Sequence, residues 1–255
     1  MDNEKYTYRP FNRVFWAIIV LLTVFYVVLA FALRNCSLSV KKIIMLIFSG
    51  CLVVYYFIYK YRLSRDKEYD EMYYSKVGGF TWWYELPLHL CNINMFLVPL
   101  GILTNNRYIQ GFAFFIGPVG AMMAILMPSD PFNNTSIFKE RMRGYYITHF
   151  LITYNCIFMA VLGIYEPQYA DILPIVLVGI GLAFLIFLFN MYLRKTKIAI
   201  KANYFYTVEP EENMVLQFFN RYIPIPFLYL IPVFILFVPY MYLVTFIYKL
   251  LTGNQ

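Results

Sequence analysis

The segment Trp82–Leu103, WWYELPLHLCNINMFLVPLGIL, combines the apolar length of a membrane helix with an unusual set of polar side chains. Roughly 20 apolar residues suffice for a helix to cross the hydrocarbon core of a bilayer. Ionisable and amide groups are costly in hydrocarbon, so they usually face a bundle interior or a wet cavity and mark a functional site. The segment is therefore predicted to be a transmembrane helix that carries part of that site. Its polar or reactive residues are Glu85, His89, Cys91, Asn92 and Asn94.

The composition of the whole chain is that of an integral membrane protein. Of its 255 residues, 61% are hydrophobic and only 14% are charged, whereas about 25% of residues are charged in an average soluble domain. The basic residues lie in short segments between apolar stretches, where membrane orientation accounts for them. We therefore expect no nucleic-acid partner. The four cysteines have neither zinc-site nor disulfide-framework spacing, and no metal or other cofactor is expected.

Seven apolar stretches are long enough to cross a bilayer, and nothing between them is long enough to fold as a soluble domain. The first is longer than the 7–15-residue core of a signal peptide, so it is expected to be a true span. The predicted fold is an all-α, seven-transmembrane helical bundle that occupies residues 1–255 as one domain. The expected spans are about 14–33, 43–60, 82–103, 108–128, 145–165, 171–193 and 226–250.

The basic residues divide unequally between the two sides of this bundle. The N-terminus and the second, fourth and sixth loops hold 16 of the 21 Lys and Arg residues. Cytoplasmic loops carry such an excess in membrane proteins. The bias predicts a cytoplasmic N-terminus and a C-terminus outside, in a multi-pass protein of the cell membrane. The five basic residues of the other side are Arg34, Lys41, Lys42, Arg107 and Lys249.

Two connecting segments are longer than simple turns. Residues 60–81 are charged and rich in tyrosine, which predicts a short interfacial helix followed by a break at Gly78–Gly79. Residues 194–226 contain acidic and basic clusters typical of a solvated cytoplasmic loop. Pro224 and Pro226 are expected to stop any helix there and to set the entry of the last span.

Helical spacing indicates which polar groups of the third span share a face. Glu85 and His89 are four residues apart and would face the same side, whereas His89 and Cys91 would lie about 200° apart at 3.6 residues per turn. If Cys91 is a nucleophile, its base is therefore expected from another span, unless Pro87 or Pro99 distorts this one. The only other histidine is His149, in the fifth span. The two residues are expected to differ in depth by roughly 7–8 Å at a rise of 1.5 Å per residue, which helix tilt can absorb.

Structural explanations compete with functional ones for each of these residues. A membrane cysteine is most often a small packing residue, which is the favoured interpretation of Cys36, Cys51 and Cys156. Intramembrane asparagines such as Asn155 often serve as hydrogen-bond links between helices. The run from Gly117 to Gly120, with Pro118, indicates a kink and a point of close helix packing.

Three sequence blocks resemble the YwaF family of bacterial integral membrane proteins. They are LPLHLCNINMFLVPLGILTNNR at residues 86–107, FFIGPVGAMMAILMPSD at 114–130, and NYFY at 203–206. Together with the histidine-bearing fifth span, the resemblance runs in order from about Tyr84 to Pro226. Family members have seven spans, as expected for this chain. One departure is the sequence THFLITYN after Ile147, where a glycine-rich SHGG-like motif is typical of the family.

That family is similar to the eukaryotic transmembrane protein 164, a cysteine-dependent acyltransferase that moves polyunsaturated acyl chains between phospholipids. It is more distantly similar to the androgen-induced hydrolases, which use an intramembrane Thr/His pair. The resemblance implies that Cys91 is the nucleophile and His149 the base, and it assigns no role to His89.

Two functions of different classes follow from these residues. In the first, Cys91 and His149 transfer an acyl group of a membrane lipid, and Asn92, Asn94 or Asn155 supply oxyanion donors. In the second, the protein is a transporter or sensor. Glu85, His89 and the asparagines line its polar cavity, and the Glu–His pair provides proton coupling. A third, weaker option is a haem or metal site at His89 and His149; two histidines on different helices allow such a site, but they are too few to require it. The sequence does not predict the oligomeric state.

Overall fold

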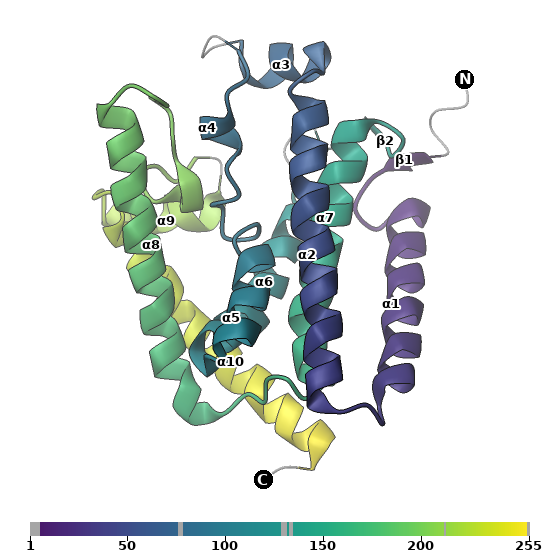
Figure 1. The fold of residues 1–255 in the computed structure, drawn as a ribbon. Helices are drawn as coiled ribbons and strands as arrows, with labels where there is room; N and C mark the ends of the chain where they lie inside the picture. Colours follow the sequence, from purple (N-terminus) through teal and green to yellow (C-terminus); the bar gives the residue numbers. More distant parts are fainter. Residues whose placement is uncertain (1–5, 76–78, 129–131, 133–134, 212, 254–255) are drawn as a thin grey trace.

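The computed structural model describes residues 6–75, 79–128, 132, 135–211 and 213–253. Almost all regular structure in this part of the chain is helical (Figure 1). A short antiparallel pair, β1 (Thr7–Tyr8) and β2 (Thr135–Ser136), joins the N-terminal segment to the start of the seventh helix, with Thr7 opposite Ser136. The α-helices are α1 (Arg13–Leu33), α2 (Leu38–Leu63), α3 (Lys67–Tyr73), α4 (Trp82–Glu85), α5 (Asn94–Thr104), α6 (Arg107–Leu126), α7 (Glu140–Val161), α8 (Ile172–Lys195), α9 (Met214–Tyr222) and α10 (Ile231–Thr252). Three 3₁₀ turns are η3 (Tyr169–Asp171), η4 (Tyr204–Tyr206) and η5 (Leu228–Leu230).

Five helices of the described chain are long and apolar enough to cross a membrane. They are α1, α2, α6, α8 together with η3, and α10 together with η5. Each coincides with one of the expected spans. Large apolar side chains such as Leu21, Leu173 and Leu236 are exposed along their outer faces, as expected of side chains that contact lipid. The chain is therefore an all-α, multi-pass membrane protein.

The helix α7 occupies the centre of the bundle. It packs against α6, α2, α5 and α1, and Figure 1 shows it behind α2. With 22 residues it is as long as the five apolar helices, but it is less apolar and is not one of them. Polar side chains are buried along its whole length: Arg141, Thr148, His149, Thr153 and Asn155.

The prediction of a continuous helix over residues 82–103 is wrong. The helix α4 ends at Glu85, and α5 begins only at Asn94. Leu86 adopts an extended conformation, with φ −59° and ψ 139°, because the ring of Pro87 disfavours helical geometry in the residue before it. Pro87 also lacks the N–H group that a continuing helix would need. The faces assigned above to Glu85, His89 and Cys91 therefore do not apply.

The two long connecting segments differ in how well they were predicted. In residues 60–81, α3 is the expected short helix, and Gly79 has a φ of 110°; Gly78 lies outside the described residues. Residues 194–226, by contrast, are not simply a solvated loop. Tyr204, Phe205 and Thr207 are buried, because this segment folds back against α8.

Candidate active site

Cys91 lies in a turn at the N-terminal end of α5. The turn is closed by hydrogen bonds from the Ile93 N–H to the His89 carbonyl, at 3.0 Å, and from the Asn94 N–H to the Cys91 carbonyl, at 3.3 Å. Gly120 of α6 faces it, and a Cβ atom there would lie 3.5 Å from the Cys91 nitrogen. Such a distance is an ordinary van der Waals contact, so the turn that carries Cys91 packs against α6 at this position.

His149 projects from α7 toward this turn. Its Nε2 atom lies 3.4 Å from the sulfur of Cys91, and its Nδ1 atom lies 2.7 Å from the backbone carbonyl oxygen of Tyr145. A carbonyl oxygen only accepts hydrogen bonds, so Nδ1 must carry the proton. In the neutral ring Nε2 then presents its lone pair to the Cys91 thiol. The cross-helix contact expected from the sequence is present.

The Cys91 sulfur also lies near a helix end. Cys91 and Asn92 precede the N-cap residue and first turn of α5, where the helix dipole is positive. Such a position favours negative charge, and reactive thiolates are often found at helix N-termini. The sulfur thus lies between the N-terminal end of α5 and the imidazole that projects from α7.

His89 does not belong to this contact. Its ring packs edge-on against Tyr204, at a centroid distance of 5.2 Å, and against Tyr206, at 5.6 Å. The side chain therefore fills the space between the Cys91 turn and η4. The sequence argument separated His89 from Cys91 by assuming a continuous helix, which the structure does not have. The histidine that contacts Cys91 is nevertheless His149, in the segment predicted as the fifth span.

Glu85 is held in a buried ion pair rather than facing His89. One carboxylate oxygen accepts a hydrogen bond from Lys60 of α2, and the other accepts from the hydroxyls of Tyr69 and Tyr74. The Tyr56 hydroxyl also donates to the Glu85 backbone carbonyl at 2.9 Å. Lys60, which the sequence placed in a cytoplasmic loop, is 8% exposed. We call Lys60, Glu85 and these three tyrosines the Glu85 clamp; it fixes the segment that leads to Cys91.

The three asparagines occupy different surroundings. Asn155 accepts a hydrogen bond of 2.7 Å from the Tyr26 hydroxyl of α1 and links two helices. The Asn94 amide donates to the Leu90 carbonyl at 2.6 Å. The side-chain oxygens of Asn92 and Asn94 are buried without a hydrogen-bond partner. Because an amide side chain carries both an acceptor oxygen and an NH₂ donor, Asn92 and Asn94 bring polar groups of both kinds to the turn that carries Cys91.

Two tyrosines that the sequence did not single out lie at the site. Tyr145 supplies the carbonyl that orients His149, and its ring lies 4.3 Å from the imidazole. The ring of Tyr206 packs against His89, at a centroid distance of 5.6 Å. Tyr206 also has a left-handed backbone, with φ 54°, and follows Phe205 at φ 61°. Such conformations cost about 1–3 kcal/mol each in non-glycine residues and concentrate at functional sites.

Side chains from two further helices maintain this strained segment. Asn190 of α8 donates to the Tyr204 carbonyl at 2.8 Å and accepts from the Tyr204 N–H at 3.0 Å. The hydroxyl of Tyr229 donates to the Tyr206 carbonyl. The signal in the sequence was the NYFY motif itself, but nothing in it showed that the motif returns to the bundle interior.

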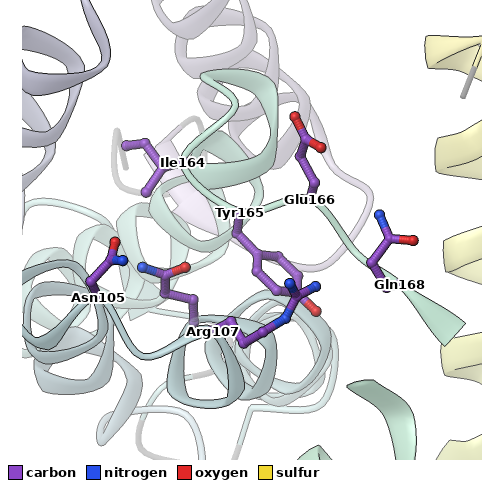
Figure 2. Close-up of a pocket in the computed structure, with 7 residues that line it drawn as sticks. Asn105, Arg107, Ile164, Tyr165, Glu166 and Gln168 are labelled. Carbon is purple, nitrogen blue, oxygen red and sulfur yellow. The ribbon is translucent and has the colours of Figure 1, made fainter. Parts of the chain in front are cut away.

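A separate polar pocket of about 310 Å³ lies at the far end of α5 and α6. Figure 2 shows Arg107 and Tyr165 beside it, with Glu166 and Gln168 further out. The helix α5 has 11 residues and is thus about 16 Å long at 1.5 Å per residue. This pocket is therefore distinct from the Cys91–His149 site, which lies at the opposite end of α5. Its full lining is Asn105, Arg107, Gln110, Ile164, Tyr165, Glu166 and Gln168.

In the described ranges, no three His, Cys, Asp or Glu side chains converge as metal ligands. All four cysteines are free. Cys156 is buried and packs against Gly117 of α6, while Cys51 is exposed on the outside of α2. The catalytic candidates thus reduce to Cys91, His149 and the groups around them.

The comparison with known families agrees with this architecture. A model of the TMEM164 family matches residues 6–245, a range that includes both Cys91 and His149. No curated protein and no solved structure matches the chain. Since the family match covers nearly the whole sequence, the chain belongs to the TMEM164 family.

Proposed function

We propose that this protein is a membrane-embedded acyltransferase or hydrolase that acts on lipid esters, with Cys91 as nucleophile and His149 as base. The observation that carries the proposal is the 3.4 Å contact between the Cys91 sulfur and the unprotonated Nε2 of His149. A thiol needs such a base, because the thiolate is the nucleophile and apolar surroundings disfavour it. The wider resemblance to the phospholipid acyltransferase described above supports the same chemistry.

In the first half-reaction, His149 Nε2 removes the thiol proton as the sulfur attacks the carbonyl carbon of a lipid ester. The carbonyl oxygen becomes an oxyanion. The bond from carbon to the ester oxygen then breaks, and His149 returns its proton to that leaving oxygen. The products are a lysolipid with a free hydroxyl and an acyl thioester on Cys91. The hydrogen bond from Nδ1 to the Tyr145 carbonyl stabilises the imidazolium that exists between these two proton transfers.

In the second half-reaction, a lipid hydroxyl or water loses its proton to His149 and attacks the thioester. The Cys91 sulfur leaves and takes the proton back from His149. The unpartnered side-chain oxygen of Asn92 is an acceptor that can orient the attacking hydroxyl. The acceptor molecule, lipid or water, decides whether the enzyme is a transferase or a hydrolase.

The oxyanion requires hydrogen-bond donors near the sulfur. We assign this role to the backbone N–H groups of Cys91 and Asn92, which belong to the turn that carries the sulfur, and to the side-chain NH₂ group of Asn92.

We further propose that the bundle crosses the cell membrane seven times, with the N-terminus in the cytoplasm and the C-terminus outside. The broken segment α4–α5 would be the third crossing and α7 the fifth. The helix α5 is about 16 Å long, roughly half of a hydrocarbon core of about 30 Å, so the Cys91 turn would lie inside the membrane. Non-helical backbone at that depth is tolerated where it is enclosed by protein or lines a cavity. Lipids of the inner leaflet would then be the substrates.

The proposal is tested by measuring acyl exchange between phospholipids, and release of free fatty acid, with purified protein in vesicles. Cys91→Ala should abolish both activities. Cys156→Ala is the matched control, since it removes another buried thiol from the same bundle, and it should retain them. Full activity of the Cys91→Ala variant would refute the nucleophile assignment.

A further inference from the structure

Arg141, in the first turn of α7, is a buried cation with unused hydrogen-bond donors. Its side chain is 4% exposed, and its Nη2 atom donates to Glu68 at 3.0 Å. Its Nε and Nη1 atoms are buried without a hydrogen-bond partner. An unpaired buried donor costs about 1–3 kcal/mol, more when the group is charged. Such a group therefore calls for a partner that the described part of the chain does not supply.

Basic and acidic side chains surround Arg141, and the exposed basic ones are paired: Arg143 with Glu140, and Lys139 with Glu68. Arg141 lies at the N-terminal end of a 22-residue helix, where the helix dipole is positive and basic side chains are unfavourable. Lys139, at the N-cap position, makes no capping hydrogen bond, and Arg143 lies one half-turn further on. The bias of basic residues toward the cytoplasm explains Lys139 and Arg143, whose side chains are both 46% exposed. It does not explain a guanidinium that is removed from solvent.

The carboxylate of Glu68 occupies the position beside Arg141 and Lys139 that an external anion would take. It comes from α3, accepts from both Lys139 (2.9 Å) and Arg141 (3.0 Å), and is 52% exposed. Hydrogen bonds from Lys139 and Arg141 lower the pKa of Glu68 below its usual value. A phosphate has more acceptor oxygens than a carboxylate and can bind a guanidinium through two donors at once. It would also gain from the free N–H groups at the start of α7.

We propose that Arg141 and the first turn of α7 form the subsite for the phosphate group of the lipid whose ester Cys91 attacks. This inference rests on the proposed function. Arg141, Tyr145 and His149 follow one another at four-residue intervals and so lie along one side of α7. Arg141 and His149 are about 12 Å apart along the helix axis. A lipid bound by its phosphate at Arg141 would therefore keep its head group at the membrane surface and extend its ester region toward Cys91.

The test measures binding in a Cys91→Ala background, so that its outcome does not depend on turnover. The full-length protein in detergent is titrated with dihexanoyl phosphatidylglycerol, with dihexanoylglycerol, which lacks the phosphate, and with inorganic phosphate. Thermal stabilisation reports binding. The phospholipid should stabilise the protein, and neither dihexanoylglycerol nor inorganic phosphate should do so at the same concentration. Equal binding of inorganic phosphate would show that the site binds free anions rather than a lipid. Equal binding of dihexanoylglycerol would show that the phosphate does not contribute to lipid binding. Either result overturns the proposal.

Variants of the basic turn locate the effect. Arg141→Gln should weaken phospholipid binding at least tenfold, whereas Arg65→Gln, which removes the same charge from an exposed side chain outside α7, should bind like its parent. Glu68→Gln removes the competing carboxylate and should bind more tightly. If Arg141→Gln fails to fold, Arg141→Lys keeps the charge without the two-donor geometry and should show a weaker but measurable loss. Unchanged binding in the Arg141 variants, or weaker binding in Glu68→Gln, would contradict the proposal. Loss of acyl transfer in Cys91→Ala together with no effect at Arg141 would refute the subsite alone.

Discussion

His149 differs from the other histidine in what each of its ring nitrogens contacts. A main-chain carbonyl of its own helix binds Nδ1, and a thiol from another element lies at Nε2. The carbonyl has the role that a carboxylate has in other nucleophile–base–orienter arrangements, because it fixes the tautomer and the ring position. His89 is instead packed between two tyrosine rings. The two histidines are therefore expected to respond differently to the same substitution.

His149→Gln should slow acylation of Cys91 by roughly 10²–10⁴-fold, the usual contribution of a positioned general base. His89→Gln should leave the rate within the same order of magnitude, since that ring makes packing contacts. Rapid-quench measurement of the acyl-enzyme, after mixing with a short-chain phospholipid, gives both rates. If His89→Gln is as slow as His149→Gln, or if His149→Gln is unaffected, the assignment of the base is wrong.

At the scale of elements, the decisive feature is the interruption between α4 and α5. The chain has a buried polar clamp before the break, at Glu85, and the reactive turn after it, at Cys91. Because the clamp draws on α2, α3 and α4, it fixes one end of the extended segment. The packing of Gly120 against the turn fixes the other. The position of Cys91 thus depends on helices that contribute nothing to its chemistry.

Lys60→Met should destabilise the protein by about 3–5 kcal/mol, because it leaves the Glu85 carboxylate buried without its counter-ion. The double variant Lys60→Met/Glu85→Leu should recover much of that loss, since no isolated charge remains. Unfolding by denaturant in detergent micelles measures both, and Lys195→Met at an exposed site serves as control. A double variant as unstable as Lys60→Met would show that the clamp does more than neutralise charge.

The contact between α2 and α7 is predicted to be sensitive to a single methyl group. A Cβ atom at Gly144 would overlap the ring of Tyr59, so Gly144→Ala should cost about 1–3 kcal/mol, as overpacking usually does. Gly181 of α8 has no atom within 4 Å of such a Cβ, and Gly181→Ala should be neutral or slightly stabilising. Thermal unfolding of the two variants compares them directly. If both variants are equally stable, Tyr59 does not pack against Gly144 as described.

The sequence predicted the helices of this bundle better than it predicted their polar contacts. Five spans, the short helix α3 and the pairing of Cys91 with the fifth span followed from apolar length and from the location of only two histidines. The break at Leu86 was signalled by Pro87, but proline is tolerated in many membrane helices, and Pro99 does lie inside α5. The burial of Lys60 and the return of Tyr206 to the site depend on contacts between distant segments. Periodicity carries no information about such contacts.

At the scale of the whole molecule, the two ends of the described chain lie at opposite ends of the bundle (Figure 1). One side of the bundle carries most of the basic side chains, and there lie the C-terminal ends of α2 and α8 and the start of α7. The pocket near Arg107 lies on the opposite side. Chain ends on opposite sides are what an odd number of membrane crossings would require.

Membrane orientation can be measured by cysteine labelling in a variant that lacks the four native cysteines. Glu166→Cys should react with a membrane-impermeant maleimide added to intact cells, because residue 166 would face outward. Arg65→Cys should react only after the cells are opened. The reverse labelling pattern would show that the protein has the opposite orientation in the membrane. Labelling of both positions in intact cells would contradict seven crossings.

The most direct test of the central claim is intact-protein mass spectrometry after brief incubation with a short-chain phospholipid. We predict an adduct of one acyl mass that maps to Cys91, is released by hydroxylamine as a thioester should be, and is absent from Cys91→Ala. It should form far more slowly in His149→Gln. A protein that transfers acyl groups without this adduct, or that carries it on another residue, would contradict Cys91 as the nucleophile.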